Sequence, residues 1–226
     1  MLNRYLLLKT HLVVSFTLPL LVGFSTNARA DSDPGPWSVS IGPAYVDFHD
    51  STRLSIGGAP VAGAGATVQS NTTLAAEVSY HFTPSWSAGL TIGVPPRSAV
   101  TGTGTAEPFG LLGAVRYGAL VGTAKYSFDT ASPWHPYLGA GFAYYVVVKN
   151  HDAFISDLKV KNRFGSALQA GVEYAISPSL GVAIDVKKLF VKTTASGTIA
   201  ALGGAPAQAD VTLNPMVFEV GAVFHF

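Results

Sequence analysis

The sequence predicts an all-β fold, an eight-stranded antiparallel transmembrane β-barrel with short periplasmic turns and long extracellular loops. Three observations predict it: an apolar composition without long apolar runs, turns at a near-constant spacing, and strict alternation of apolar residues. Of the 226 residues, 48% are hydrophobic and only 12% are charged, about half the share that is usual in soluble domains. Beyond the N-terminus no run approaches the roughly 20 apolar residues of a spanning helix. The apolar residues must therefore be distributed by alternation along strands.

Composition also excludes several kinds of chemistry. The formal net charge is +1 and the chain has no Cys, so we expect no nucleic-acid partner, disulfide framework, thiol catalysis or Cys-ligated metal. The histidines beyond residue 30 show no metal-ligand spacing; they are His49, His81, His135, His151 and His225. We therefore expect no metal site and no cofactor.

Residues 1–30 predict a secretory signal peptide. Arg4 and Lys9 precede the apolar residues 12–24, and Ala28-Arg29-Ala30 has the pattern of a cleavage site. The apolar core is short and closes on small residues, which favours a cleaved signal over an anchoring helix. The mature chain, residues 31–226, then carries 11 basic and 13 acidic residues, a net charge of −2.

Three short proline turns divide the mature chain. From Trp37, through Pro84, Pro133 and Pro178, to Phe226, the intervals are 47, 49, 45 and 48 residues. Each interval holds two alternating apolar segments around a polar or Gly/Ala-rich middle, which is typical of a hairpin. Four hairpins predict eight strands, at residues 37–48, 72–83, 86–95, 112–128, 136–149, 163–177, 179–193 and 214–226.

Alternation is clearest in the last strand, where Met216, Phe218, Val220, Ala222, Phe224 and Phe226 share one face. We expect Pro43 to cause a bulge or bend in the first strand, and Arg116 interrupts the outward register of the fourth. Of the long loops, residues 58–66 and 195–209 are Gly/Ala-rich and predict flexibility. Residues 152–161 fit either a short helix or a mobile loop. A soluble β-sandwich with similar alternation is the competing fold.

Aromatic residues favour the membrane alternative. All three tryptophans fall at the predicted periplasmic end, where aromatic rings with a polar handle prefer the membrane interface. The expected girdle comprises Trp37, Trp86, Trp134, Tyr80, Phe82 and Tyr126. The alternating aromatic C-terminus, with Phe218, Phe224 and Phe226, resembles the signal that outer-membrane proteins present to the barrel-insertion machinery. Aromatic packing at one end of a sandwich is the alternative.

The inward residues predict a lumen of two halves. Six charged residues lie near the middle or the periplasmic half: Glu77, Lys125, Glu173, Asp185, Lys187 and Glu219. We expect them to form a structural salt-bridge plug, because an isolated buried charge is costly; a polar relay for permeation is the alternative. Above them, Tyr145, Val147, Leu189 and Val191 predict an apolar lumen. An apolar funnel above a plug suggests sideways exit of a solute between strands, although ordinary packing of a tapered interior explains the pattern equally well.

Three side chains, Glu77, Ser79 and His81, lie on the same face of one predicted strand. These residue types could resemble a catalytic set of nucleophile, base and a residue that orients the base. These side chains stand in a row along one strand near the periplasmic rim. The sequence therefore predicts a protein that is not an enzyme.

Three stretches resemble the outer-membrane protein W family, OmpW. They are Ser132-Pro133-Trp134-His135-Pro136-Tyr137-Leu138-Gly139-Ala140-Gly141, Asp185-Val186-Lys187-Lys188-Leu189-Phe190, and residues 214–226. The resemblance covers essentially the whole mature chain, although the first and second loops depart from it in being rich in Gly, Ala and Thr. It implies a small eight-stranded outer-membrane barrel in a Gram-negative bacterium that forms a narrow channel or binding site for small hydrophobic molecules. The expected partners are outer-membrane lipid, the insertion machinery and such molecules. A structural or surface-interaction barrel, acting in adhesion or in phage or host contact, is the alternative.

Overall fold

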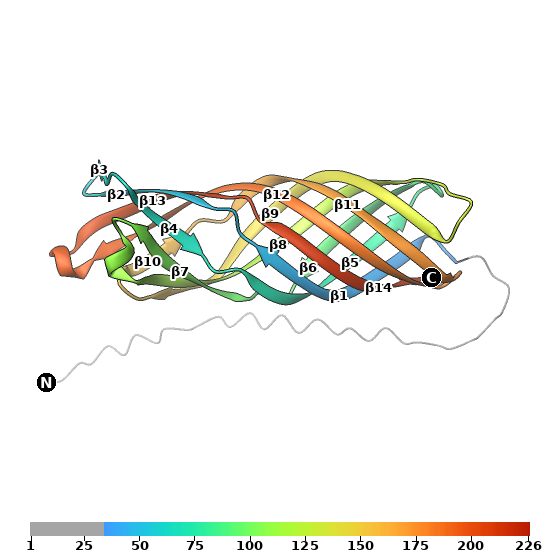
Figure 1. The fold of residues 1–226 in the computed structure, drawn as a ribbon, viewed down its shortest axis with the longest axis horizontal. Helices are drawn as coiled ribbons and strands as arrows, with labels where there is room; N and C mark the ends of the chain where they lie inside the picture. Colours follow the sequence, from blue (N-terminus) through green and yellow to red (C-terminus); the bar gives the residue numbers. More distant parts are fainter. Residues whose placement is uncertain (1–33) are drawn as a thin grey trace, which may run out of the picture. The chain divides into compact units, whose positions relative to one another are not determined.

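The computed structural model describes residues 34–226, so the predicted signal peptide lies outside the described residues. These residues form a closed antiparallel barrel (Figure 1). Its eight wall strands are β1 (Trp37–Asp47), β5 (Asn71–His81), β6 (Trp86–Gly93), β8 (Leu111–Ser127), β9 (Trp134–Asp152), β11 (Arg163–Ser177), β12 (Leu180–Ile199) and β14 (Met216–His225). Each strand pairs with the next, and β14 pairs with β1 to close the ring. The predicted fold class is confirmed.

The long hairpins continue the sheet beyond the wall, at the end away from the C-terminus (Figure 1). Six further strands form there: β2 (Ser51–Ile56), β3 (Ala59–Pro60), β4 (Ala64–Val68), β7 (Arg97–Gly104), β10 (Ser156–Val160) and β13 (Ala205–Leu213). The segments 58–66 and 195–209, expected as flexible loops, and 152–161, expected as a helix or mobile loop, instead contain strands joined by short turns. They pair with one another across the chain, as β13 does with β12 and β2, and β4 with β7. The structure also has two short 3₁₀ turns, η1 (Glu107–Phe109) and η2 (Ala200–Leu202).

The apolar face of each wall strand points away from the lumen. In β14, Phe218, Val220 and Phe224 are exposed, whereas Glu219 and Val223 are buried. In a soluble protein the apolar face of a strand is buried and its polar face is exposed. Here the arrangement is reversed, as expected for a barrel surrounded by lipid. No helical turn within residues 34–226 is long and apolar enough to cross a membrane.

Two local expectations concern Pro43 and Arg116. Pro43 causes no bulge, because Ile41 faces Ala222 and Ala44 faces Glu219 in an unchanged register. β1 instead leaves two positions, one of them Pro43, without a partner on β14. Proline has no N–H group to donate, so this gap accommodates Pro43 without an extra residue in the strand. Arg116 does interrupt the outward apolar face of its strand as predicted, since it lies exposed on that face and the register with β9 shifts between Arg116 and Tyr117.

Aromatic pairs mark the two ends of the apolar band. Trp134 contacts Tyr174 with ring centroids 4.7 Å apart, and Tyr144 contacts Phe164 at 4.4 Å. The two pairs lie ten residues apart on both β9 and β11. At about 3.3 Å per residue and a tilt of about 40°, this is about 25 Å along the barrel axis, the usual height of a lipid-facing band.

Close approach of two strands predicts a sensitive position at Gly141. A Cβ atom on Gly141 would overlap the backbone oxygen of Gly122 on β8, whereas one on Gly118 would meet only Pro95 Cγ at 3.5 Å. We expect Gly141→Ala to lower the free energy of unfolding by about 1–3 kcal/mol through overpacking. Gly118→Ala should change it by less than about 0.5 kcal/mol. Urea unfolding in detergent micelles measures both, and equal effects would contradict the close approach.

Candidate functional site

A charged cluster fills the middle of the lumen, and Lys187 is its centre. The Lys187 ammonium group lies 2.6 Å from Asp185, 3.3 Å from Glu219 and 3.4 Å from Glu77. Lys125 of β8 also pairs with Glu77. Five of the six charged residues predicted to line the lumen are thus brought together from β5, β8, β12 and β14.

Glu173, the sixth, lies apart from this cluster. Its carboxylate is 2.7 Å from His225 Nε2, in a half-buried pair near the short-turn end. The ring of His225 lies 5.9 Å from that of His81, which in turn contacts the Ser38 hydroxyl at 2.9 Å. Glu173 therefore belongs to a smaller polar group below the main cluster.

Neutral side chains complete the main cluster. Gln169 donates to Asp185 at 2.7 Å and to Glu77 at 3.0 Å, and it accepts from the Thr123 hydroxyl at 2.6 Å. The Tyr137 hydroxyl donates to Asp185 at 2.7 Å. Sequence reasoning left these residues out because it considered only charges. Alternation already places Gln169 and Tyr137 on the inward faces of their strands, so the signal was present.

Among the described residues, the cluster has one carboxylate more than it has ammonium groups. Glu77, Asp185 and Glu219 face only two ammonium groups, those of Lys125 and Lys187. Glu219 is 3% exposed, and its Oε1 atom has no hydrogen-bond partner within the described residues. Glu219 is therefore the least satisfied member of the cluster.

Apolar side chains occupy the lumen above the charged cluster. Tyr145, Leu189 and Val191 are buried in one core cluster, and Val147 packs against it. Tyr145 stacks on Tyr117 with ring centroids 5.4 Å apart and an interplanar angle of 19°. The lumen thus changes from polar to apolar within β12, between Lys187 and Leu189.

Two apolar cavities adjoin this aromatic pair. The outer cavity, about 70 Å³, lies under the strands of the long hairpins and is lined among others by Leu54, Leu158 and Val211. The inner cavity, about 80 Å³, reaches from Lys187 and Leu189 to the barrel wall. Tyr145 lines both cavities, so this side chain lies between them.

The inner cavity meets the wall where a backbone ladder is interrupted. The pairs between β6 and β8 end with Thr91 opposite Val121. β7 resumes the pairing with Arg97 opposite Arg116. Between these points, residues 118–120 of β8 pair with β9 alone. The wall therefore has a local break in its hydrogen-bonded ladder.

Two adjacent prolines explain the break. Pro95 and Pro96 carry no N–H group, so they cannot donate to β8. The Tyr117 N–H donates to the Pro96 oxygen at 3.3 Å across this break. Val94, Pro96 and Gly118 all line the inner cavity.

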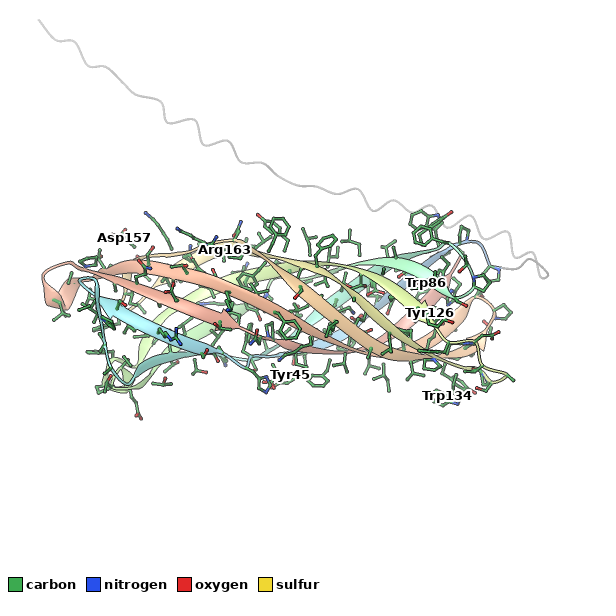
Figure 2. The ribbon with its side chains drawn as sticks, turned by 90° about the horizontal axis from the view of Figure 1, so that it is seen from above. Tyr45, Trp86, Tyr126, Trp134, Asp157 and Arg163 are labelled. Atoms are coloured by element: carbon green, nitrogen blue, oxygen red, sulfur yellow. The ribbon has the colours of Figure 1, made fainter. Side chains whose placement is uncertain are left out.

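Three of the predicted girdle residues, Trp86, Tyr126 and Trp134, lie on the outer surface at the short-turn end (Figure 2). The other three, Trp37, Tyr80 and Phe82, are also exposed. Trp37 packs on Tyr80 at 4.9 Å, and Tyr80 on Phe82 at 5.2 Å. Trp86 packs on Tyr126 at 5.2 Å, and Trp134 on Tyr174 as described above. The C-terminal phenylalanines Phe218, Phe224 and Phe226 are also exposed on the outer surface.

The series Glu77, Ser79 and His81 is not arranged as a nucleophile and its base. The Ser79 hydroxyl contacts Glu77 at 3.2 Å and the Lys125 ammonium at 2.9 Å, while the His81 ring contacts Ser38. Across residues 34–226, no group of three or more acidic or histidine side chains could hold a metal ion. The charged groups of the main cluster instead pair with one another, with one carboxylate in excess.

Comparisons with known proteins agree on one family. Residues 33–226 match the model of the OmpW family. The dibenzothiophene metabolism operon protein PahQ of Pseudomonas aeruginosa is 31% identical over 189 residues, which are 84% of this chain and 88% of that protein. Outer membrane protein W of Escherichia coli is 30% identical over 182 residues, 74% of this chain and 82% of that protein. The crystal structure of outer membrane protein OprG from P. aeruginosa matches with a TM-score of 0.80 at 26% identity, covering 86% of this chain and 97% of that one.

The unequal charges of the cluster predict unequal mutational effects. Lys187→Met leaves buried carboxylates without their shared cation, and we expect it to lower the free energy of unfolding by about 3–5 kcal/mol. Glu219→Gln keeps the shape and removes the excess charge, so it should stay within about 1 kcal/mol of the parent. Urea unfolding in micelles compares the two. A Glu219→Gln loss as large as that of Lys187→Met would refute the charge count.

Proposed function

The chain belongs to the OmpW family of outer-membrane barrels of Gram-negative bacteria, and from this premise we propose that it admits small hydrophobic molecules into the outer membrane. The proposal rests on the lumen, whose apolar half contains cavities and lies above a half that is filled by ion pairs. An eight-stranded barrel is just wide enough for its own side chains to fill. The interior therefore suits binding and short-range passage of an apolar solute rather than an aqueous pore.

The charged cluster favours passage that does not continue downward. Around the cluster the free volume is about 40 Å³, lined by Glu77, Lys125, Asp185, Lys187 and Glu219 among others. An apolar molecule entering it would separate buried ion pairs without replacing their hydrogen bonds, which is costly. In this proposal the cluster is a plug that stops the solute.

The interrupted ladder supports exit through the wall. The inner cavity extends from Leu189 to Val94 and Gly118 at the break between β6 and β8. Val94 is 59% exposed on the outer surface, so the break connects the apolar lumen to the lipid-facing side. A solute leaving here exchanges one apolar environment for another and need not disrupt a regular ladder.

Tyr145 is the proposed control point of this route. The two cavities, about 70 and 80 Å³, are far smaller than the roughly 300–1,000 Å³ typical of ligand pockets, so the proposed route requires an opening movement. Because Tyr145 lines both cavities, rotation of its ring away from Tyr117 would join them. Tyr145, Val147, Leu189 and Val191 form the proposed apolar path.

The relatives favour an aromatic or otherwise compact apolar solute. PahQ is named for a dibenzothiophene metabolism operon, and dibenzothiophene is a flat, apolar heterocycle. An outer-membrane barrel must also be exported and inserted. The proposal therefore includes residues 1–30 as a signal peptide and the C-terminal Phe218, Phe224 and Phe226 as the insertion signal.

Uptake of dibenzothiophene tests this function. Cells that lack their own OmpW-family proteins and express this chain should accumulate the compound faster than cells expressing an unrelated eight-stranded barrel. The fluorescence of the solute reports its uptake. Equal rates, together with adhesion that is lost when the long hairpins are deleted, would instead favour the surface-interaction alternative.

Filling the break should slow uptake without unfolding the barrel. Gly118→Phe places a ring beside Pro95, where the backbone leaves room for a Cβ atom, and we expect uptake to fall at least fivefold. Ala124→Phe adds the same ring to the outward face of β8, where Ala124 is paired with Ala88 and Ala140 in intact ladders. It should leave uptake unchanged. The uptake assay compares the two at matched amounts of folded protein, and equal rates would exclude exit at this break.

A further inference from the structure

Three basic side chains form a row on the outer face of the wall. Arg97 of β7 lies opposite Arg116 of β8, and Arg116 lies opposite Lys149 of β9. All three residues are exposed. Directly opposite residues in antiparallel strands have Cα atoms about 4.5–5.5 Å apart, so the row concentrates positive charge on three neighbouring strands.

A bulge in β9 completes this row, which we call the basic row. Arg116 faces Lys149 whereas the next residue, Tyr117, faces Val147, so Val148 is an extra residue without a partner on β8. Without it, Lys149 would share the inward face with Tyr145 and Val147. A bulge re-aims the residues that follow it, and here it turns Lys149 outward beside Arg116.

No acidic side chain compensates the basic row. The ion pairs formed among residues 34–226 include none of its three members. The nearby carboxylate of Asp152 accepts the backbone N–H groups of Asp157 at 2.9 Å and Leu158 at 3.0 Å. Like charges directly opposite one another destabilise a sheet, so the row leaves a repulsion that a bound anion would relieve.

The basic row lies just beyond the lipid headgroup layer, within reach of its phosphate groups. Leu120 of β8 is opposite Tyr144, a member of the outer aromatic pair. Arg116 is four residues further along β8, about 10 Å higher at about 3.3 Å per residue and a tilt of about 40°. The headgroup layer extends about 5–8 Å beyond the hydrocarbon, and long basic side chains can reach back toward it.

The surface below the row is suited to acyl chains. The outward residues of β6, β8 and β9 are apolar up to the basic row, and they include Leu90, Ile92, Leu120, Phe142 and Val148. Each of the three neighbouring segments therefore changes from apolar to basic at the same level. This combination fits a lipid whose chains lie on the wall and whose headgroup is anionic.

We propose that Arg97, Arg116 and Lys149 bind the phosphate groups of a phosphorylated lipid in the outer leaflet. Guanidinium groups hold phosphate oxygens through paired, charge-assisted hydrogen bonds, and an ammonium group adds a further donor. The site is independent of solute passage, although Arg97 directly follows the prolines of the wall break. The bound lipid would thus stand beside that break.

The test compares lipid binding by two charge-matched triple variants. Arg97→Gln/Arg116→Gln/Lys149→Gln removes the row, and Lys159→Gln/Lys161→Gln/Lys192→Gln removes three other exposed cations. The probes are bis-phosphorylated lipid A, dephosphorylated lipid A and inorganic phosphate, titrated calorimetrically into the protein in zwitterionic micelles. We expect the first variant to bind phosphorylated lipid A at least tenfold more weakly than the parent, and the second to bind within threefold of it. Dephosphorylated lipid A should not distinguish the proteins.

Several outcomes would overturn the proposal. Equal affinity of the parent and the first variant would remove the site, and an equal loss in the second variant would reduce it to general charge attraction. Inorganic phosphate binding as tightly as phosphorylated lipid A would show a free-anion site instead. Removing the row should leave the urea midpoint in lipid-free micelles unchanged or raised, because repulsion is relieved. Should the triple variant fail to fold, Arg116→Gln alone is expected to bind at least threefold more weakly, and parental affinity in it would refute the site.

Discussion

Inside a bilayer, an unpaired backbone N–H or C=O group costs several kcal/mol, and the closed ladder from β1 to β14 satisfies almost all of them. Against that closure, the interrupted stretch between β6 and β8 is significant. Between Thr91 and Arg97 the chain leaves β8 partly unpaired at the point where an apolar cavity reaches the wall. Pro95 and Pro96 limit the cost, since they have no N–H groups to leave unsatisfied. A weak point of the ladder can therefore persist in lipid.

Closure also determines what the lumen can hold. Glu77, Lys125, Asp185, Lys187 and Glu219 come from four strands, and they are neutralised only because the ring brings those strands face to face. Most of these side chains are buried, so removing one partner would leave a buried charge uncompensated, which is costly. Glu219 shows the limit of this compensation. The apolar residues above the cluster need no polar partners, so cavities can form in that half of the lumen.

The strands above the membrane extend this division outward. Leu54 of β2, Leu158 of β10 and Val211 of β13 form the walls of the outer cavity. The hairpins therefore enclose apolar space instead of lying open to water. At the same height on the outer surface, the basic row begins where the lipid-facing residues end. The same hairpin region thus encloses apolar space inside and bears the basic row on its outer surface.

Alternation and turn spacing in the sequence determined the eight strands, the aromatic girdle and the inward position of the six charged residues, because the two-residue period of a strand depends on local geometry alone. Pairing between distant segments decided the rest. The segments 58–66 and 195–209 are Gly/Ala-rich, and their local sequence does not favour a strand. They contain strands because β4, β12 and β13 pair with other strands of the barrel. The inclusion of Gln169, the separate pairing of Glu173 and the break beside Pro95 likewise depend on which strand lies opposite. Only the closed barrel specifies those neighbours.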